Sequence, residues 1–232
     1  MKMNREQILY EDNDIIVCYK PPKIAVQTAK VGQRDMVSEI ANYLGRPYVG
    51  VVHRLDQPVE GILVFAKNPK AANGLSKQIA ENKMEKYYYA VISAKSLLEK
   101  PEQMQKGTLV DYLYKDGKTN TSAVVSKERQ GAKRAELIYE IQNILKNEEI
   151  ALVRIKLVTG RHHQIRVQMS HAGMSLLGDY KYADEQTKKL SEQLQQEQIA
   201  LCAYQISFRH PLTGKPMVFR KEPEGEIFHK FL

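Results

Sequence analysis

The stretch VGVVHRLDQPVEGILVFAKN, residues 49–68, is the most informative part of this 232-residue chain. An apolar lead-in and a second apolar run at 62–66 enclose a polar turn, which predicts two strands joined by a loop. Within the turn, Asp56 follows His53 and Arg54, so a carboxylate lies beside cationic groups directly before a strand. Such a segment is also typical of a structural loop whose Asp makes an ion pair or an Asx-turn. The rest of the chain decides between a reactive acid and a structural one.

The bulk composition is that of an ordinary globular protein. With 43% hydrophobic and 27% charged residues over 232 positions, the chain can bury a real core, and we expect one domain spanning residues 1–232. No apolar run approaches the length of a membrane span, and the start lacks the apolar core of a signal peptide, so we expect a cytoplasmic protein without membrane contact. Cys18 and Cys202 lie in apolar, strand-like stretches, which predicts buried free thiols rather than a disulfide.

The charge balance is basic and unevenly distributed. The chain has 35 Lys and Arg against 27 Asp and Glu, a net charge of +8, which favours a polyanionic partner. Six of these cations fall within twenty residues: Lys115, Lys118, Lys127, Arg129, Lys133 and Arg134. The stretch is read as a basic hairpin at about 107–135, with Asp116-Gly117 as its turn. A nucleic-acid contact and a solvated hairpin both fit this pattern.

The order of predicted elements indicates an α+β fold. Strands are predicted at 8–10, 15–19, 86–94, 134–145, 149–158, 200–209 and 216–220. Helices are predicted at 37–44, after Asn68-Pro69, from Arg161 to Ala172, and as a polar surface helix at 184–198. Strand pairs with interspersed helices predict a single domain built on a large mixed, mostly antiparallel β-sheet, flanked by helices and loops.

Four short motifs occur in a fixed order along the chain. They are Tyr19-Lys20-Pro21-Pro22; His53-Arg54-Leu55-Asp56 with Gly61 and Ala66-Lys67; Lys86-Tyr87-Tyr88-Tyr89-Ala90; and Gly160-Arg161-His162-His163-Gln164-Ile165-Arg166. Gly178-Asp179-Tyr180-Lys181-Tyr182 and the stretch from Leu201 to Gly214 add to them. Over nearly the whole chain this combination resembles the RluA-type family of RNA pseudouridine synthases.

The resemblance implies an isomerase that converts a uridine of structured ribosomal or transfer RNA to pseudouridine, in an RNA cleft across the sheet. Asp56 matches the family's nucleophile, and attack at C1′ of the ribose or at C6 of the uracil both remain open. Arg166 matches the Arg that keeps this carboxylate ionised. Tyr88 matches the aromatic residue that stacks on the uracil, while Tyr87 and Tyr89 fall on the opposite face of the strand, where we expect core packing.

Contacts with RNA follow from the same resemblance. A flipped base leaves a gap in the stack at a cost of about a few kcal/mol, and Arg54 matches the residue that fills it, although a phosphate contact fits equally well. Further RNA contacts are expected from His53, from Arg161 as a phosphate ligand, and from Lys20, for which a plain surface lysine is the alternative. In the hairpin, Lys115, Lys118 and Lys133 are the expected backbone contacts.

The chain departs from the family pattern in two places. After the Asp, the family commonly has a basic residue, an acidic residue, Thr and Ser, whereas this chain has Gln57, Pro58, Val59 and Glu60. We expect this change to affect loop conformation and substrate choice rather than reaction type. The chain also starts at the catalytic region, so we expect no separate N-terminal RNA-binding domain and assign RNA recognition to the catalytic domain.

Two other functions compete with this reading. A non-catalytic RNA-binding protein on the same fold predicts loss of Asp56, Tyr88 or Arg166, and all three are present. A metal-dependent hydrolase would rest on the adjacent His162 and His163, but adjacent histidines on a helix point about 100° apart and cannot readily share one ion. We therefore expect no metal and no cofactor, since an internal rearrangement needs none, and a monomer acting on RNA.

Overall fold

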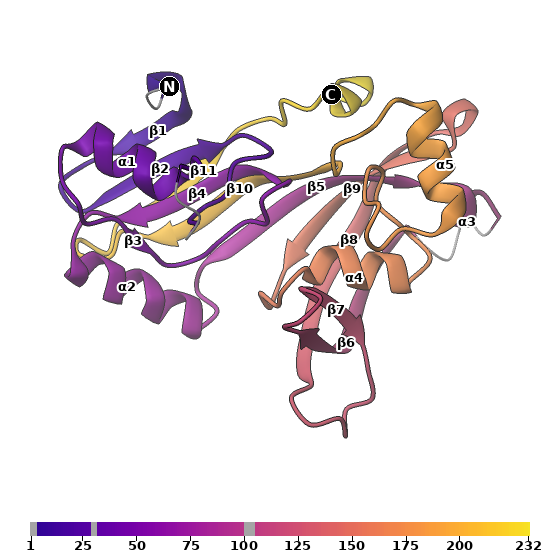
Figure 1. The fold of residues 1–232 in the computed structure, drawn as a ribbon, viewed down its shortest axis with the longest axis horizontal. Helices are drawn as coiled ribbons and strands as arrows, with labels where there is room; N and C mark the ends of the chain where they lie inside the picture. The colour runs from indigo at the N-terminus through magenta and orange to yellow at the C-terminus, as the bar shows by residue number, and fades with distance from the viewer. Residues whose placement is uncertain (1–3, 29–31, 100–104) are drawn as a thin grey trace. The chain divides into compact units, whose positions relative to one another are not determined.

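The computed structural model describes residues 4–28, 32–99 and 105–232. It has the predicted α+β fold, with a large sheet of eleven strands accompanied by helices (Figure 1). The chain divides into two compact units, one made of Met1–Lys86 and Ala203–Pro223 and the other of Tyr87–Cys202 and Glu224–Leu232. Each unit is described by itself.

The first unit contains the N-terminal strands and the predicted Asp56 turn. Its elements are the 3-10 helix η1 (Arg5–Gln7), β1 (Ile8–Glu11), β2 (Ile15–Lys20), α1 (Met36–Leu44), β3 (Gly50–Val51), β4 (Glu60–Ala66), α2 (Pro69–Ala80), most of β10 (Leu201–Arg209) and β11 (Pro216–Arg220). Antiparallel pairing joins β1 to β2, β2 to β4, β3 to β4, and β10 to β11. Every residue of β2 and β4 is buried, which makes this strand pair the core of the unit. The predicted helix start at Asn68 is confirmed, because its side chain accepts from the N–H of Ala71, and α1 ends at Gly45, which has a left-handed backbone.

Gly61 fixes how closely β10 approaches β4. Its φ of 133° lies in the region that favours glycine, and a Cβ added there would meet the backbone N of Ala203 at 2.5 Å. No movement of a side chain relieves a clash with backbone. The glycine after the Asp56 turn is therefore required by strand packing.

The second unit contains five antiparallel strands of the sheet. It holds most of β5 (Glu85–Ser93), then α3 (Lys95–Glu99), β6 (Lys106–Asp116), β7 (Thr121–Val124), β8 (Lys133–Leu145), η2 (Lys146–Glu148), β9 (Ile150–Leu157), α4 (Gln164–His171), α5 (Glu185–Gln193) and η3 (Glu226–Lys230). The strands pair in the order β5, β9, β8, β6, β7. The predicted basic hairpin is thus three strands, because β6 pairs with β7 beyond Leu113 and with β8 before it. We call residues 106–140 of β6, β7 and β8 the arm.

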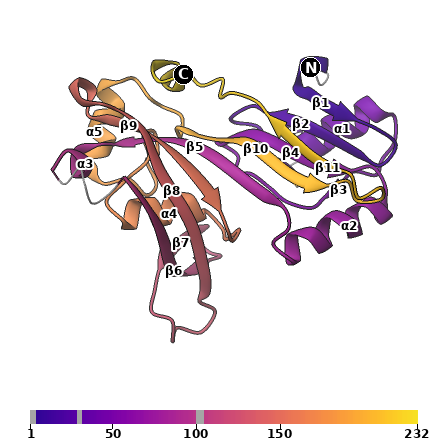
Figure 2. The same ribbon diagram turned by 180° about the vertical axis from the view of Figure 1, so that it is seen from behind.

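Helix α4 covers one face of the arm. Leu113 and Ala135 pack against Val167 of α4, with Val124 and Tyr182 beside them. The view from behind shows the strands of the arm in front of α4, so none of the helices in the described part of the chain covers the opposite face (Figure 2). This packing explains why the two faces of the arm hold different side chains.

Two helix predictions need correction. Helix α4 begins at Gln164 rather than at Arg161, and Gln164 to Met169 are all buried, so it has no polar outer face. The polar surface helix predicted at 184–198 is shorter, because α5 ends at Gln193, and it has two buried side chains, Thr187 and Ser191, of which the Ser191 hydroxyl accepts from the N–H of Gly178 at 3.0 Å. Among the described residues, none of the helices is long and apolar enough to cross a membrane.

Candidate active site

The predicted nucleophile lies in a tight turn that precedes β4. The carbonyl of Asp56 accepts from the N–H of Val59 at 3.0 Å, which closes the turn over Gln57 and Pro58. Leu55 and Val59 are buried on either side, whereas the Asp56 side chain is half-buried. The amide of Gln57 donates to the carbonyl of Lys23 at 3.0 Å, so this turn is also tied to the loop after β2.

Lys20 fixes the backbone of this turn through a hydrogen bond to the carbonyl of Gln57. Its ammonium group is fully buried and donates to three carbonyls, those of Pro21 at 3.0 Å, Ile24 at 2.8 Å and Gln57 at 3.0 Å. Burial lowers the pKa of Lys20 to about 7, and Asp56 and Glu60 oppose that shift. The three ammonium hydrogens all go to backbone oxygens, so Lys20 is not the plain surface lysine that was the alternative, and its contact with RNA stays a prediction. The side chain positions the Asp56 turn.

His53 and Arg54 differ in their surroundings. The ring of His53 accepts the N–H of Val64 at its Nε2, at 3.2 Å, and burial together with Lys86 lowers its pKa to about 3. A neutral ring bonded to the backbone of β4 holds the loop in place, and its contact with RNA stays a prediction. Arg54 is exposed, as both of its predicted roles require.

Glu60, which replaces a small hydroxyl residue of the family pattern, is buried at the start of β4. It accepts a hydrogen bond from the hydroxyl of Tyr19, which is itself buried. The ammonium group of Lys221 lies 4.9 Å from the centre of the Tyr19 ring. The acid therefore does not project towards solvent, and its printed hydrogen-bond partner is a tyrosine.

Tyr88 lies in β5 opposite Ile155 of β9 and is 5% exposed. The neighbouring Tyr87 and Tyr89 are only half-buried, so the prediction that they fill the core is wrong. The ring of Tyr87 instead packs beneath the guanidinium of Arg154, at 4.7 Å. Strand alternation is as expected, but the buried side is the one that carries Tyr88.

Arg166 is 6% exposed and makes a two-pronged ion pair with Asp179. Its Nε donates to one carboxylate oxygen at 2.8 Å and its Nη2 to the other at 2.7 Å. The guanidinium carbon also lies 4.9 Å from the centre of the Tyr182 ring. Neither partner was assigned a role from sequence, although both belong to the 178–182 motif. The acid of that motif could have indicated the ion pair from sequence, because a buried Arg requires a paired anion.

His162 and His163 are not arranged as the sequence predicted. They precede α4, and the left-handed backbone of His163 brings the two rings into a stack with centroids 3.7 Å apart. His162 Nδ1 is 2.8 Å from the hydroxyl of Ser122, and His163 Nδ1 is 2.6 Å from that of Tyr182. Burial, followed by Arg166, lowers the pKa of His163 to about 4.

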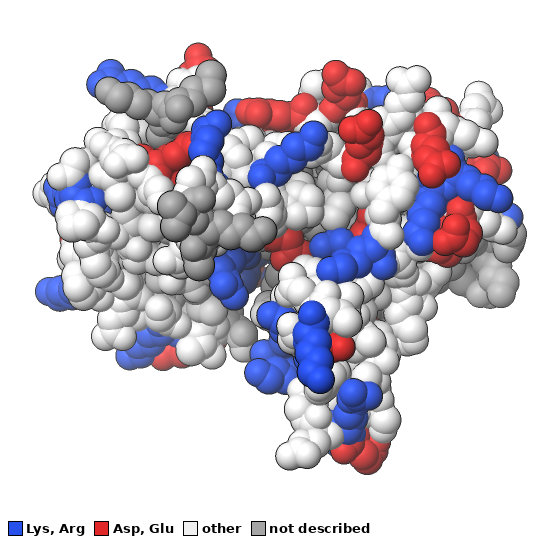
Figure 3. Space-filling view, in the orientation of Figure 1, with Lys and Arg blue, Asp and Glu red and all other residues white. Residues whose placement is uncertain are grey.

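The basic residues of the arm are divided between its two faces. Lys133 pairs with Leu113, and Lys115 is two residues from Leu113 on the same strand, so both are on the α4 face. Arg134 pairs with Tyr112, and Arg129 lies 4.0 Å from the ring of Tyr114, so both are on the opposite face. Lys118 lies in the turn between β6 and β7, where its N–H donates to the Asp116 carboxylate at 2.8 Å. Figure 3 shows Lys and Arg side chains gathered over this part of the molecule.

Arg161 stays exposed beside the arm. Its Nε donates to the carbonyl of Arg134 at 2.9 Å, which fixes the start of the side chain against β8. Its predicted phosphate contact stays a prediction. Lys181 is also exposed and donates to the carbonyl of Asn120 in the turn of the arm, at 2.9 Å.

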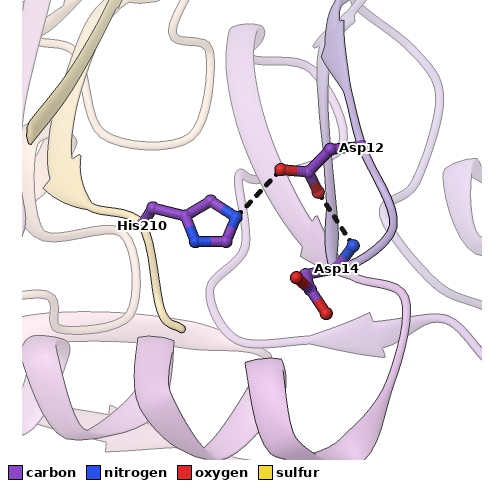
Figure 4. Close-up of side chains that lie close together, drawn as sticks. All are labelled: Asp12, Asp14 and His210. Carbon is purple, nitrogen blue, oxygen red and sulfur yellow. Dashed lines mark hydrogen bonds and ion pairs between the residues drawn. The ribbon is translucent and has the colours of Figure 1, made fainter. Parts of the chain in front are cut away.

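One cluster with metal-binding residue types occurs in the described part of the chain, at Asp12, Asp14 and His210 (Figure 4). The Nδ1 of His210 accepts the N–H groups of Leu212 and Thr213, so its Nε2 carries the proton and donates to Asp12 at 2.9 Å. Burial alone would raise the pKa of Asp12, but hydrogen bonds from Ile15 and Asp14 lower it. The cluster is a hydrogen-bonded link between the β1–β2 turn and the end of β10, and His210 has no lone pair to give a metal.

The predicted catalytic residues are thus distributed between the two units. Asp56 belongs to the first unit, where Lys20 and Gln57 hold its turn. Tyr88 and Arg166 belong to the second, where Arg166 is fixed by Asp179 and Tyr182.

Comparison with known proteins agrees with this arrangement of motifs. The family model of RNA pseudouridylate synthase matches residues 14–171. An uncharacterized RNA pseudouridine synthase of Aquifex aeolicus is 33% identical over 94% of this chain and 69% of its own length. The ribosomal large subunit pseudouridine synthase D of Zymomonas mobilis is 31% identical over 93% of this chain and 68% of its own length.

A solved structure shows the same fold. Human RNA pseudouridylate synthase domain containing 4 superposes with a TM-score of 0.75 at 20% identity, covering 97% of this chain and 92% of that one. The sequence match over residues 14–171, together with relatives above 30% identity, establishes the family. The chain therefore belongs to the RluA-type RNA pseudouridine synthases and is an isomerase that acts on RNA.

Proposed function

We propose that the protein converts a specific uridine of structured ribosomal or transfer RNA to pseudouridine, with Asp56 as the nucleophile. The observation that supports this most directly is the Asp56 turn, which Lys20 and Gln57 hold from two sides while its carboxylate stays half-buried. A nucleophile needs such a fixed position with access to a substrate.

The reaction balances without a cofactor. Attack by the carboxylate at C1′ displaces N1 and forms an ester between Asp56 and the ribose; the uracil turns in place, and its C5 then attacks C1′ and displaces the carboxylate. Attack at C6 instead attaches the uracil to Asp56 while the bond between C1′ and N1 breaks; the base turns, a bond forms between C1′ and C5, and the carboxylate leaves C6. On both routes the proton leaves C5, N1 gains one, and Asp56 is regenerated. In this proposal Tyr88 stacks on the uracil, and Arg166 stabilises the ionised Asp56.

Base flipping is the second part of the proposal. A uridine stacked inside folded RNA has to leave the stack before Asp56 can reach its ribose, at a cost of about a few kcal/mol. Arg54 is exposed beside the turn and has the planar group that can stack in the vacated space. A phosphate contact by Arg54 is the alternative, and it predicts weakened binding rather than slowed turnover in Arg54→Ala.

The substrate is identified by mapping pseudouridine in cellular RNA with and without the gene. We expect one or a few uridines in ribosomal or transfer RNA to lose the modification in the deletion strain. Wild-type protein should restore them, and Asp56→Asn should not. An unchanged map in the deletion strain would refute the proposed function.

The arm is proposed to follow the RNA backbone on its α4 face. Lys115 and Lys133 share that face, whereas on the opposite face Arg134 is paired with Glu136 at 2.6 Å and Arg129 lies against Tyr114. Replacing Lys115 and Lys133 with Gln should lower the salt slope of RNA binding by roughly 0.7–0.9 for each lost phosphate contact.

The matched control removes the same number of charges from the other face. Arg129→Gln with Arg134→Gln should leave the salt slope of RNA binding close to that of wild type. Equal slopes in the two double variants would mean that the arm acts only through its net charge, and a wild-type slope in both would exclude the arm from RNA binding.

A further inference from the structure

The 179–182 segment surrounds Arg166 with a set of contacts that the family motifs leave without a role. Asp179 takes two hydrogen bonds from the guanidinium, and its Oδ1 also accepts the N–H groups of Lys181 and Tyr182, at 3.1 Å and 3.3 Å. Tyr182 follows three residues later, and its ring lies against the same guanidinium at 4.9 Å. The Asp179 carboxylate therefore fixes the edge of the Arg166 guanidinium, and the Tyr182 ring covers one of its faces.

The hydroxyl of Tyr182 fixes the position of that ring. It accepts the N–H of Ser122 in β7 at 2.9 Å and lies 2.6 Å from Nδ1 of His163. We assign the phenolic O–H as the donor to Nδ1, an arrangement that satisfies both contacts and leaves His163 neutral with its proton on Nε2. The lowered pKa of His163, at about 4, agrees with this tautomer.

We propose that Tyr182 is a positioning residue for Arg166, with its ring supporting the guanidinium and its hydroxyl fastening that ring to β7 and to His163. The inference rests on the proposed role of Arg166 in catalysis. It assigns Tyr182 no contact with the substrate. It also connects Arg166 to the turn of the arm, because Lys181 in the same segment donates to the carbonyl of Asn120.

The test compares Tyr182→Phe and Tyr182→Leu with wild type. Phenylalanine keeps the ring against Arg166 and loses both hydroxyl contacts, so kcat should fall roughly tenfold with KM within about twofold. Leucine also loses the ring, and kcat should fall further, by roughly a hundredfold. Tyr180→Phe is the control, because Tyr180 is 45% exposed two residues away and should behave as wild type in both parameters.

A pH profile separates positioning from a general loss of structure. The groups facing His163 are Arg166 from α4, Lys181 and Asp179 from the 179–182 segment, Lys115 from β6, and the stacked ring of His162. In Tyr182→Phe the neutral ring loses a hydrogen-bond partner at Nδ1, so the pKa of His163 should rise above about 4, while burial and Arg166 still hold it below its ordinary value. A charged His163 repels Arg166, so on the acid side kcat of the variant should begin to decline at a higher pH than kcat of wild type.

These measurements test the role of Tyr182 whether or not Asp56 is the nucleophile. A raised pKa of His163 by NMR, together with the shifted acid limb in kcat, supports the positioning role. Three results would overturn it. The first is a wild-type kcat in both Tyr182 variants, and the second is a change in KM alone. The third is a loss of kcat that only follows the folded fraction, with an unchanged pH profile. Asp56→Asn, assayed in parallel, tests the proposed function separately, and the NMR measurement needs no activity.

Discussion

Asp56→Asn is expected to abolish pseudouridine formation, lowering turnover by at least about two orders of magnitude, because an amide cannot replace a carboxylate nucleophile. The fold should be unaffected, since the turn is closed by the backbone of Asp56 and held by Lys20 and Gln57 rather than by the carboxylate alone. Activity on a transcript that contains the mapped uridine, measured with the melting temperature, checks both expectations.

Binding and a matched acid separate catalysis from other effects. RNA affinity should persist in Asp56→Asn, because phosphate contacts supply most of it. Asp14→Asn makes the same chemical change at another half-buried acid of the first unit and should leave turnover unchanged. If Asp56→Asn retains a tenth of wild-type activity, the assignment of the nucleophile is wrong.

Arg166→Ala is expected to have the second largest effect and to act on both catalysis and stability. Turnover should be lost because the proposed partner of the Asp56 carboxylate is removed. The substitution also leaves Asp179 buried without its guanidinium, and breaking such a pair costs roughly 3–5 kcal/mol. Turnover at a temperature where the variant is folded, with thermal unfolding alongside, measures the two effects.

A double variant distinguishes these contributions. Arg166→Ala with Asp179→Asn removes the unpaired buried charge, so much of the stability should return while turnover stays lost. Recovery of turnover together with stability would make Arg166 a purely structural residue. Normal turnover with weakened RNA affinity would instead make it a phosphate ligand.

Local patterns were enough to predict most strands of the fold and the positions of α1 and α2. Alternation and aromatic content located β5, the Asn68-Pro69 pair located the start of α2, and Asp116-Gly117 located the turn of the arm. These signals depend on residues close in sequence, because capping, strand propensity and turn chemistry act over a few positions. The buried thiols of Cys18 and Cys202 also followed from their apolar surroundings.

The predictions that failed concern burial of polar groups. Lys20 looks like a surface cation in sequence, yet it is fully buried because the carbonyl of Gln57, 37 positions away, completes its hydrogen bonds. The basic hairpin divides into two unlike faces only because α4 covers one of them. Likewise, His162 and His163 stack because a left-handed backbone at His163 delays the start of the expected helix to Gln164.

The sequence by itself determined the family, the order of the strands and helices, and the identity of the acid, tyrosine and arginine that the motifs carry. Only the tertiary structure showed that Asp179 and Tyr182 hold Arg166, that Lys20 holds the Asp56 turn, and that His210 is bonded to Asp12 across 198 positions. Motifs record which residue types are present. The charge state and orientation of a buried group depend on the partners that replace its lost water, and those partners come from distant parts of the chain.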